Sequence, residues 1–153
     1  MLDPALGHVD ARTEVLLLLA ARAQHVEEVI APALAAGRDV VCDRFSGSTL
    51  AYQGYGRGLD PAELERLSEW ASGGVRPDLV VLLQVAPEVA RRRRQGRGAD
   101  DRVEGEGTAF FERVERGFAD LARSDPARWR VVDGSGPVEE VAVRVLKAAG
   151  FPK

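Results

Sequence analysis

The chain has 153 residues, of which 45% are hydrophobic and 29% charged, and a formal net charge of −3. This length suits a single domain, residues 1–153, and the acidic balance argues against a dedicated nucleic-acid-binding protein, which would be basic. The longest apolar run, Val15–Ala21, is too short to cross a bilayer. Because the chain has one cysteine, Cys42, in an apolar stretch, and no signal-peptide pattern, we expect a cytoplasmic protein with a buried thiol.

The first half of the chain predicts one long helix, a short strand and a second helix. Residues 12–36 favour a largely buried helix that is kinked or split at Pro32. Residues 39–42 are apolar enough for a short strand, and a polar, glycine-rich loop follows at 43–60. Residues 61–72 have apolar side chains at helical spacing after a proline suited to a first turn.

The second half alternates strands and helices. Residues 79–85 read LVVLLQV, which is typical of a strand buried on both faces. The further expected elements are a helix opened by Pro87, a helix at 104–124, a strand at 129–134 and a helix at 137–149. This alternation predicts βαβ units and therefore an α/β fold with a parallel sheet flanked by helices.

The loop CDRFSGSTLAYQGYGRGLD, residues 42–60, is the first candidate ligand site. Loops at the carboxyl ends of parallel strands are where α/β proteins bind ligands. Arg44 can hold a phosphate through two hydrogen bonds, and Asp43 can organise Mg²⁺. On the residues alone, a surface turn in which Asp43 pairs with Arg44 is equally compatible. Hydroxyl and amide side chains that can fix a sugar or a base follow at Ser46, Ser48, Thr49, Tyr52 and Gln53.

Three further stretches carry chemistry. The run RRRRQGRGADDR, residues 91–102, can close over a triphosphate, although a solvated helix face or an RNA-binding patch is also compatible. Arg22 interrupts an apolar helix, where a guanidinium needs either a ligand or a carboxylate such as Glu27. DGSGP, residues 133–137, joins a strand to a helix and is by itself a weak indication of a nucleotide-base contact.

Together these stretches resemble the bacterial thymidylate kinases, which transfer the γ-phosphoryl group of ATP to dTMP. The resemblance covers nearly the whole chain, and its most specific block is DRF followed by AYQG and GRG. The matching stretches are TEVLLLLAARAQHVEEVIAPALAAGRDVVCDRF, STLAYQGYGRGLD, PDLVVLLQVAPEVARRRR with DDRVE, and DGSGPVEEV. The resemblance implies a P-loop-kinase-like parallel sheet, dTMP and ATP as partners, Mg²⁺ with ATP, and a homodimer packed through helices in 12–36 and 61–72.

The resemblance also implies roles for single residues in the acceptor site. Arg44 corresponds to the arginine that contacts the acceptor phosphate, and Asp43 to an aspartate that meets the Mg²⁺ ion indirectly. Arg22 corresponds to the helix arginine that reads a thymine carbonyl. The remaining implied dTMP contacts are Leu18, which replaces the family's stacking phenylalanine, Ser48, Thr49 against the thymine ring, Tyr52 under the deoxyribose, and Gln53.

On the donor side, the resemblance implies a lid at residues 91–103 that brings a basic residue over ATP. Arg97 is the first choice for that catalytic arginine, and Arg93 is the second. The loop near the adenine corresponds to Gly134, Ser135 and Pro137.

One family element is absent from the sequence. Phosphoryl transfer of this type uses a P-loop, G-x-x-x-x-G-K-S/T, and no such run occurs in the 153 residues. Family members carry it on a first strand–helix–strand, whose P-loop strand lies between the strands that match 39–42 and 79–85. We therefore expect a sheet missing that unit, through an amino-terminal truncation or a mis-assigned start. The alternative function is a catalytically inactive dTMP-binding or interaction module; a nucleoside monophosphate kinase with another base preference fits the AYQG block less well.

Overall fold

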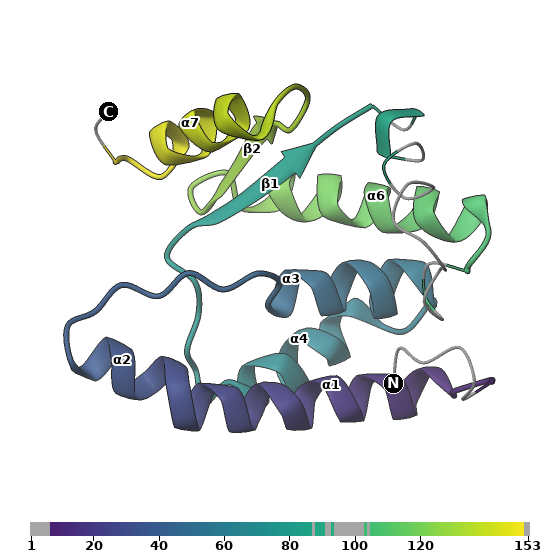
Figure 1. Ribbon diagram of the computed structural model, residues 1–153. Helices are drawn as coiled ribbons and strands as arrows, with labels where there is room; N and C mark the ends of the chain where they lie inside the picture. The colour runs from purple at the N-terminus through teal and green to yellow at the C-terminus, as the bar shows by residue number, and fades with distance from the viewer. Residues whose placement is uncertain (1–6, 87, 91–92, 94–102, 104, 152–153) are drawn as a thin grey trace.

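The computed structural model describes residues 7–86, 88–90, 93, 103 and 105–151. Helices α1 and α2 form the lower part of the molecule, and the two strands with α6 and α7 form the upper part (Figure 1). Helices α3 and α4 lie between them. The elements are α1 (Ala11–His25), η2 (Val26–Ile30), α2 (Ala31–Ala35), α3 (Ser46–Thr49), η3 (Leu50–Gly56), α4 (Pro61–Ala71), β1 (Val80–Gln84), α6 (Thr108–Ser124), β2 (Trp129–Asp133) and α7 (Val138–Ala148); η marks a π-helical segment.

The predicted long helix is confirmed as the continuous series α1, η2 and α2. Asp10 caps it by accepting a hydrogen bond from the backbone N–H of Arg12 at 3.0 Å. Pro32 lies in the first turn of α2, directly after the π-helical segment, so its missing N–H falls where the hydrogen-bond ladder already changes. The expectation of a largely buried helix is wrong: Leu16 is 63% exposed and Leu17 50%, because only one face of α1 packs against α4.

The sheet is two-stranded and parallel within the described residues. β1 pairs with β2 from Val80 opposite Trp129 to Gln84 opposite Asp133. This arrangement, with α6 connecting the strands, confirms an α/β fold with a parallel sheet flanked by helices. Burial of β1 on both faces is not found, since Leu83 remains 50% exposed.

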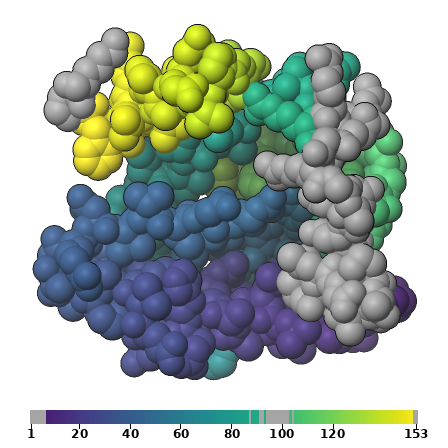
Figure 2. Space-filling view, viewed as in Figure 1, coloured from purple at the N-terminus to yellow at the C-terminus, as the bar shows by residue number. Residues whose placement is uncertain are grey.

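The strand predicted at 39–42 is not formed. This segment is part of an extended connection from α2 to α3, and a strand needs a neighbour that pairs its backbone groups. Within the described part of the chain no strand lies beside it, so Val41 is 99% exposed. Cys42 is exposed as well, contrary to the expectation of a buried thiol. Figure 2 shows a hollow between this blue segment and the yellow-green carboxyl-terminal layer.

Two apolar clusters flank η3 and fix its position. The first joins α1 to α4 and consists of Val15, Leu19, Leu64 and Ala71. The second joins η3 to α6, where Ala51, Phe110 and Val114 are buried and Tyr52 and Phe118 pack against them. The loop sequence that was predicted to bind a ligand is therefore mostly helical and packed on both sides. None of the described helices is long and apolar enough to span a membrane.

Candidate functional site

Arg22 reaches from α1 into the space in front of α3. Its Nη2 donates a hydrogen bond to Thr49 Oγ1 at 2.7 Å, and its guanidinium lies over the Phe45 ring, 5.1 Å from the centroid. The other terminal nitrogen, Nη1, is buried without a hydrogen-bond partner. Burial lowers the pKa of Arg22, and no ion pair with Glu27 or another carboxylate is found among the described residues. Nη1 is therefore a buried donor without an acceptor, and a carbonyl oxygen of a ligand would supply that acceptor.

Arg44 adopts a strained backbone at the start of the same loop. Its φ of 65° is the only positive φ of a non-glycine residue in the described chain. A left-handed conformation costs an ordinary residue about 1–2 kcal/mol, and such strain gathers at ligand sites. The side chain lies over the Tyr52 ring, 5.0 Å from the centroid, and makes no ion pair with its neighbour Asp43. The plain-turn alternative, in which these two side chains pair, is thus not what the fold forms.

Tyr52 is held from its other side by aromatic rings of α6. Its ring contacts those of Phe110 and Phe118 edge to face, with centroids 6.1 Å apart in both pairs. Thr49, the last residue of α3, bonds Arg22, and Tyr52, in the following η3, carries Arg44. The two contacts therefore lie at neighbouring points of one continuous helical stretch. Short π-helical segments are rare in proteins as a whole, and those that occur often lie at functional sites.

The other predicted acceptor residues divide into two groups. Leu18 is half-buried one turn before Arg22 on the same face of α1, and Ser48 is half-buried and precedes Thr49 in α3. Gln53 is directed elsewhere. Its Nε2 donates to Glu14 Oε1 at 2.6 Å, and the residue is only 4% exposed.

A second set of predicted residues lies at the carboxyl ends of the two strands. A shallow depression there is lined by Gln84, Val85, Ala86, Asp133 and Ser135. Hydrogen bonds from Ser135 to its carboxylate lower the pKa of Asp133. The predicted adenine loop, Gly134, Ser135 and Pro137, forms one side of this region.

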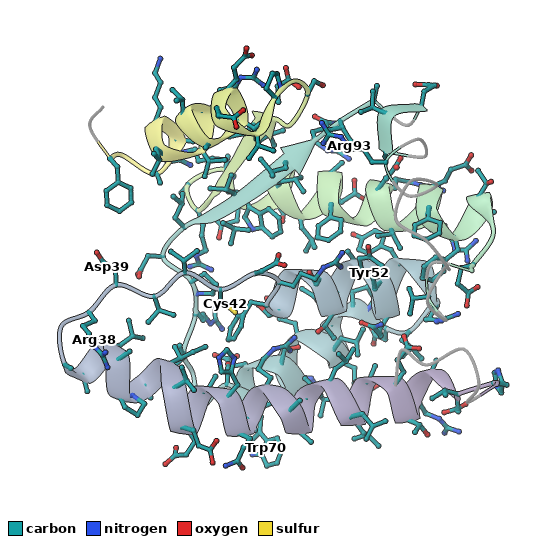
Figure 3. All side chains as sticks on the ribbon, viewed as in Figure 1. Arg38, Asp39, Cys42, Tyr52, Trp70 and Arg93 are labelled. Carbon is teal, nitrogen blue, oxygen red and sulfur yellow. The ribbon has the colours of Figure 1, made fainter. Side chains whose placement is uncertain are left out.

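Arg93 adjoins the same loop. Its Nη2 lies 3.5 Å from the carbonyl oxygen of Gly136, and Figure 3 shows it beside the connection from β2 to α7, above Tyr52 on the central helix. Arg97, the first choice for the catalytic lid arginine, lies outside the described residues, as does most of segment 91–103.

Asp43 is the predicted metal contact. In the described part of the chain, no group of three or more His, Cys, Asp or Glu side chains is arranged to hold a metal ion. Mg²⁺ in phosphate-transfer sites is usually held by one or two carboxylates together with substrate phosphates, rather than by a complete protein cage. The exposed carboxylate of Asp43, next to Arg44, fits that mode of binding.

One polar cluster was missed by the sequence reasoning. Glu14 is 1% exposed and contacts both Gln53 and Arg57, and Arg57 also pairs with Glu106. A usable signal was present in Glu14, a carboxylate at the start of a helix whose neighbours are mostly apolar, because a charge in such a place needs a partner.

Comparison with known proteins decides the family. A model of the thymidylate kinase family matches residues 4–145. The thymidylate kinase of Syntrophotalea carbinolica is 46% identical over 151 residues, which cover 95% of this chain and 70% of that protein. The thymidylate kinase of Pelotomaculum thermopropionicum is 48% identical over 97% of this chain and 69% of that protein. The chain belongs to the thymidylate kinase family.

A solved thymidylate kinase agrees with this assignment at the level of the fold. The crystal structure of the enzyme from Ehrlichia chaffeensis superposes with a TM-score of 0.74 and 29% identity, over 95% of this chain and 67% of that one. The chain is accordingly a kinase, an enzyme of the phosphotransferase class, and the family resemblance seen in the sequence is confirmed.

Proposed function

We propose that this chain binds dTMP and acts in the transfer of the γ-phosphoryl group of ATP to it, which gives dTDP for dTTP synthesis. Its sequence lacks the P-loop run that holds the ATP phosphates in this type of transfer. The observation that carries the proposal is a pair of arginines that contact one helical stretch, α3 with η3. Arg22 of α1 is bonded to Thr49 and has a buried unpartnered nitrogen, and Arg44 lies over Tyr52. Arg22 has a buried donor without a partner beside the Phe45 ring, which suits a base carbonyl. The other is exposed and cationic, which suits a phosphate.

The proposed acceptor site takes dTMP across this pair. Arg22 Nη1 donates to a thymine carbonyl, and Leu18 packs against the base in place of an aromatic ring. Thr49 and Ser48 border the base, and Tyr52 packs under the deoxyribose. Gln53 belongs to the same helical stretch, and its hydrogen bond to Glu14 supports a role in fixing that stretch rather than the predicted contact with the nucleotide.

In the proposed transfer step, Arg44 neutralises charge on the dTMP phosphate and holds it in line for attack on the γ-phosphoryl group. Asp43 would help to hold the Mg²⁺ that accompanies ATP, and the ion would supply positive charge to the donor phosphates. Arg97 or Arg93 supplies the lid arginine. Gly134, Ser135 and Pro137 border the adenine, supported by the contact between Arg93 and that loop.

We further propose that the protein acts in the cytoplasm as a homodimer. The support is exposed apolar surface on α1 and α4, which lie in the two ranges predicted to pack in a dimer. Leu16 and Leu17 of α1 are 63% and 50% exposed, and Trp70 of α4 is 82% exposed. Contiguous exposed patches of large apolar side chains are typical of protein–protein interaction sites.

Two titrations test the proposal. Calorimetry with dTMP and with thymidine measures what the phosphate contributes, and dTDP formation is followed with ATP and Mg²⁺. We expect dTMP to bind at least about tenfold more tightly than thymidine, because charge-assisted hydrogen bonds contribute about 1.5–3 kcal/mol. Arg44→Ala should remove this preference. Absence of dTMP binding to the folded chain would refute the proposal, and binding without dTDP formation would favour the binding module.

A further inference from the structure

Arg57 joins three elements of the structure through its guanidinium. Nη2 lies 3.4 Å from Glu14 Oε2 of α1, and Nη1 donates to Glu106 Oε1, just before α6. The guanidinium also lies over the Phe110 ring of α6, 4.9 Å from the centroid. Arg57 itself directly follows η3, and its backbone N–H donates to the Tyr52 carbonyl at 3.0 Å.

The charges in this cluster make the contacts specific. The Glu14 side chain is 1% exposed, and a buried carboxylate is costly unless it is paired and hydrogen-bonded. Gln53 and Arg57 contact its two oxygens. Burial lowers the pKa of Arg57, but the hydrogen bond to Glu106 and the charges of Glu14 and Glu106 outweigh burial and raise it overall. Arg57 therefore stays a cation between two carboxylates.

The Phe110 ring under Arg57 contacts a residue of the proposed acceptor site. Phe110 contacts Tyr52 edge to face, and Tyr52 in turn carries Arg44 on its ring. Arg57 and Arg44 thus hold the two ends of a cation–ring–ring–cation series. Cation–π contacts fix a ring when the cation is itself anchored, as Arg57 is by its two carboxylates.

We propose that Arg57 is a positioning residue for the acceptor nucleotide. It holds Phe110 against Tyr52 and thereby sets the place of the Tyr52 ring and of the Arg44 side chain above it. This inference rests on the proposed function, since the ligand that Tyr52 and Arg44 receive is taken to be dTMP. Arg57 does not contact the reacting groups in this scheme, and its effect passes through the two rings.

The test compares two arginines that both tie α6 to η3. Arg57→Gln removes the cation under study. Arg113→Gln is the matched control, because Arg113 donates to the Gly56 carbonyl at 2.8 and 3.1 Å but takes no part in the ring series. Affinity for dTMP is measured by calorimetry, and the folded fraction by thermal unfolding in the same buffer. We expect Arg57→Gln to weaken dTMP binding about tenfold, Arg113→Gln less than threefold, and Arg57→Lys to restore most of the affinity.

A second readout needs no ligand. The NMR resonances of the Tyr52 ring should shift in Arg57→Gln and in Glu106→Gln, but not in Arg113→Gln. Glu106→Gln is the better tolerated of the first two variants, because the Glu106 side chain is only half-buried. Equal dTMP affinity in the Arg57 and Arg113 variants, or unchanged Tyr52 resonances in Glu106→Gln, would overturn the inference. If the unmodified chain fails to bind dTMP, the proposed function falls, while the Tyr52 resonances still decide the positioning role.

Discussion

Replacing Arg22 with methionine separates a ligand-binding role from a structural one. Methionine has a helix preference similar to that of arginine and an unbranched, flexible side chain, but it removes the guanidinium with both terminal nitrogens. The lost hydrogen bond to Thr49 is charge-assisted and costs about 1.5–3 kcal/mol of folding free energy. The removed Nη1 is a buried donor without a partner, and its desolvation costs the native protein about 1–3 kcal/mol. Because these two contributions have opposite signs and overlapping ranges, we expect the free energy of unfolding to change by no more than about 2 kcal/mol in either direction.

Binding should respond differently. If Nη1 donates to a thymine carbonyl, its loss weakens dTMP binding by about 10- to 150-fold, the equivalent of 1.5–3 kcal/mol. Urea unfolding gives the stability and calorimetry the affinity. Arg76→Met is the control, because Arg76 pairs with Glu69 where both side chains are half exposed, and such pairs contribute little. A large loss of stability in Arg22→Met with unchanged affinity in the folded fraction would refute the reasoning and make Arg22 a structural residue.

Three further predictions follow from packing, surface and charge. Gly56→Ala should destabilise the fold by about 1–3 kcal/mol in urea unfolding, because the new Cβ would lie 2.6 and 2.9 Å from α6 side chains; an unchanged midpoint would contradict this packing. Trp70→Glu should shift sedimentation toward the monomer, whereas Val138→Glu, on the far layer and 79% exposed, should not. The pKa of Asp133 lies below its ordinary value of 3.8, because the ionised carboxylate accepts hydrogen bonds from Ser135. The hydrogen bond from the Ser135 amide is therefore fully formed above pH 3.8 and is lost as the pH falls through the lowered pKa. The amide resonance of Ser135 should titrate with a midpoint below 3.8.

The helices outside residues 42–60 were predictable from the sequence because their signals are local, whereas the sequence predicts a loop where α3 and η3 form. Periodic apolar side chains, a capping aspartate and a first-turn proline define α4 without reference to the rest of the chain. The prediction of a strand at 39–42 was wrong for the opposite reason. Its apolar residues satisfy the local pattern, but a strand also requires a paired neighbour, and within the described chain β1 pairs with β2 instead.

The residues of the candidate site also fall into those that the local sequence identifies and those that it does not. Asp43, Arg44 and Thr49 were identifiable because the family motif keeps them contiguous in the sequence. The Arg57 cluster was not, since its ion pairs join residues 43 and 49 positions apart, to Glu14 and Glu106, and no spacing rule connects them. Only the packing of α1 and α6 against η3 brings those charges together.

The most direct test of this account is a titration of dTMP into the isotopically labelled chain, followed by backbone amide resonances. We predict saturation at one dTMP per chain, with the largest shifts at Arg22, Arg44, Thr49 and Tyr52. A native spectrum that does not change, or shifts confined to residues 134–137, would contradict the assignment of the acceptor site.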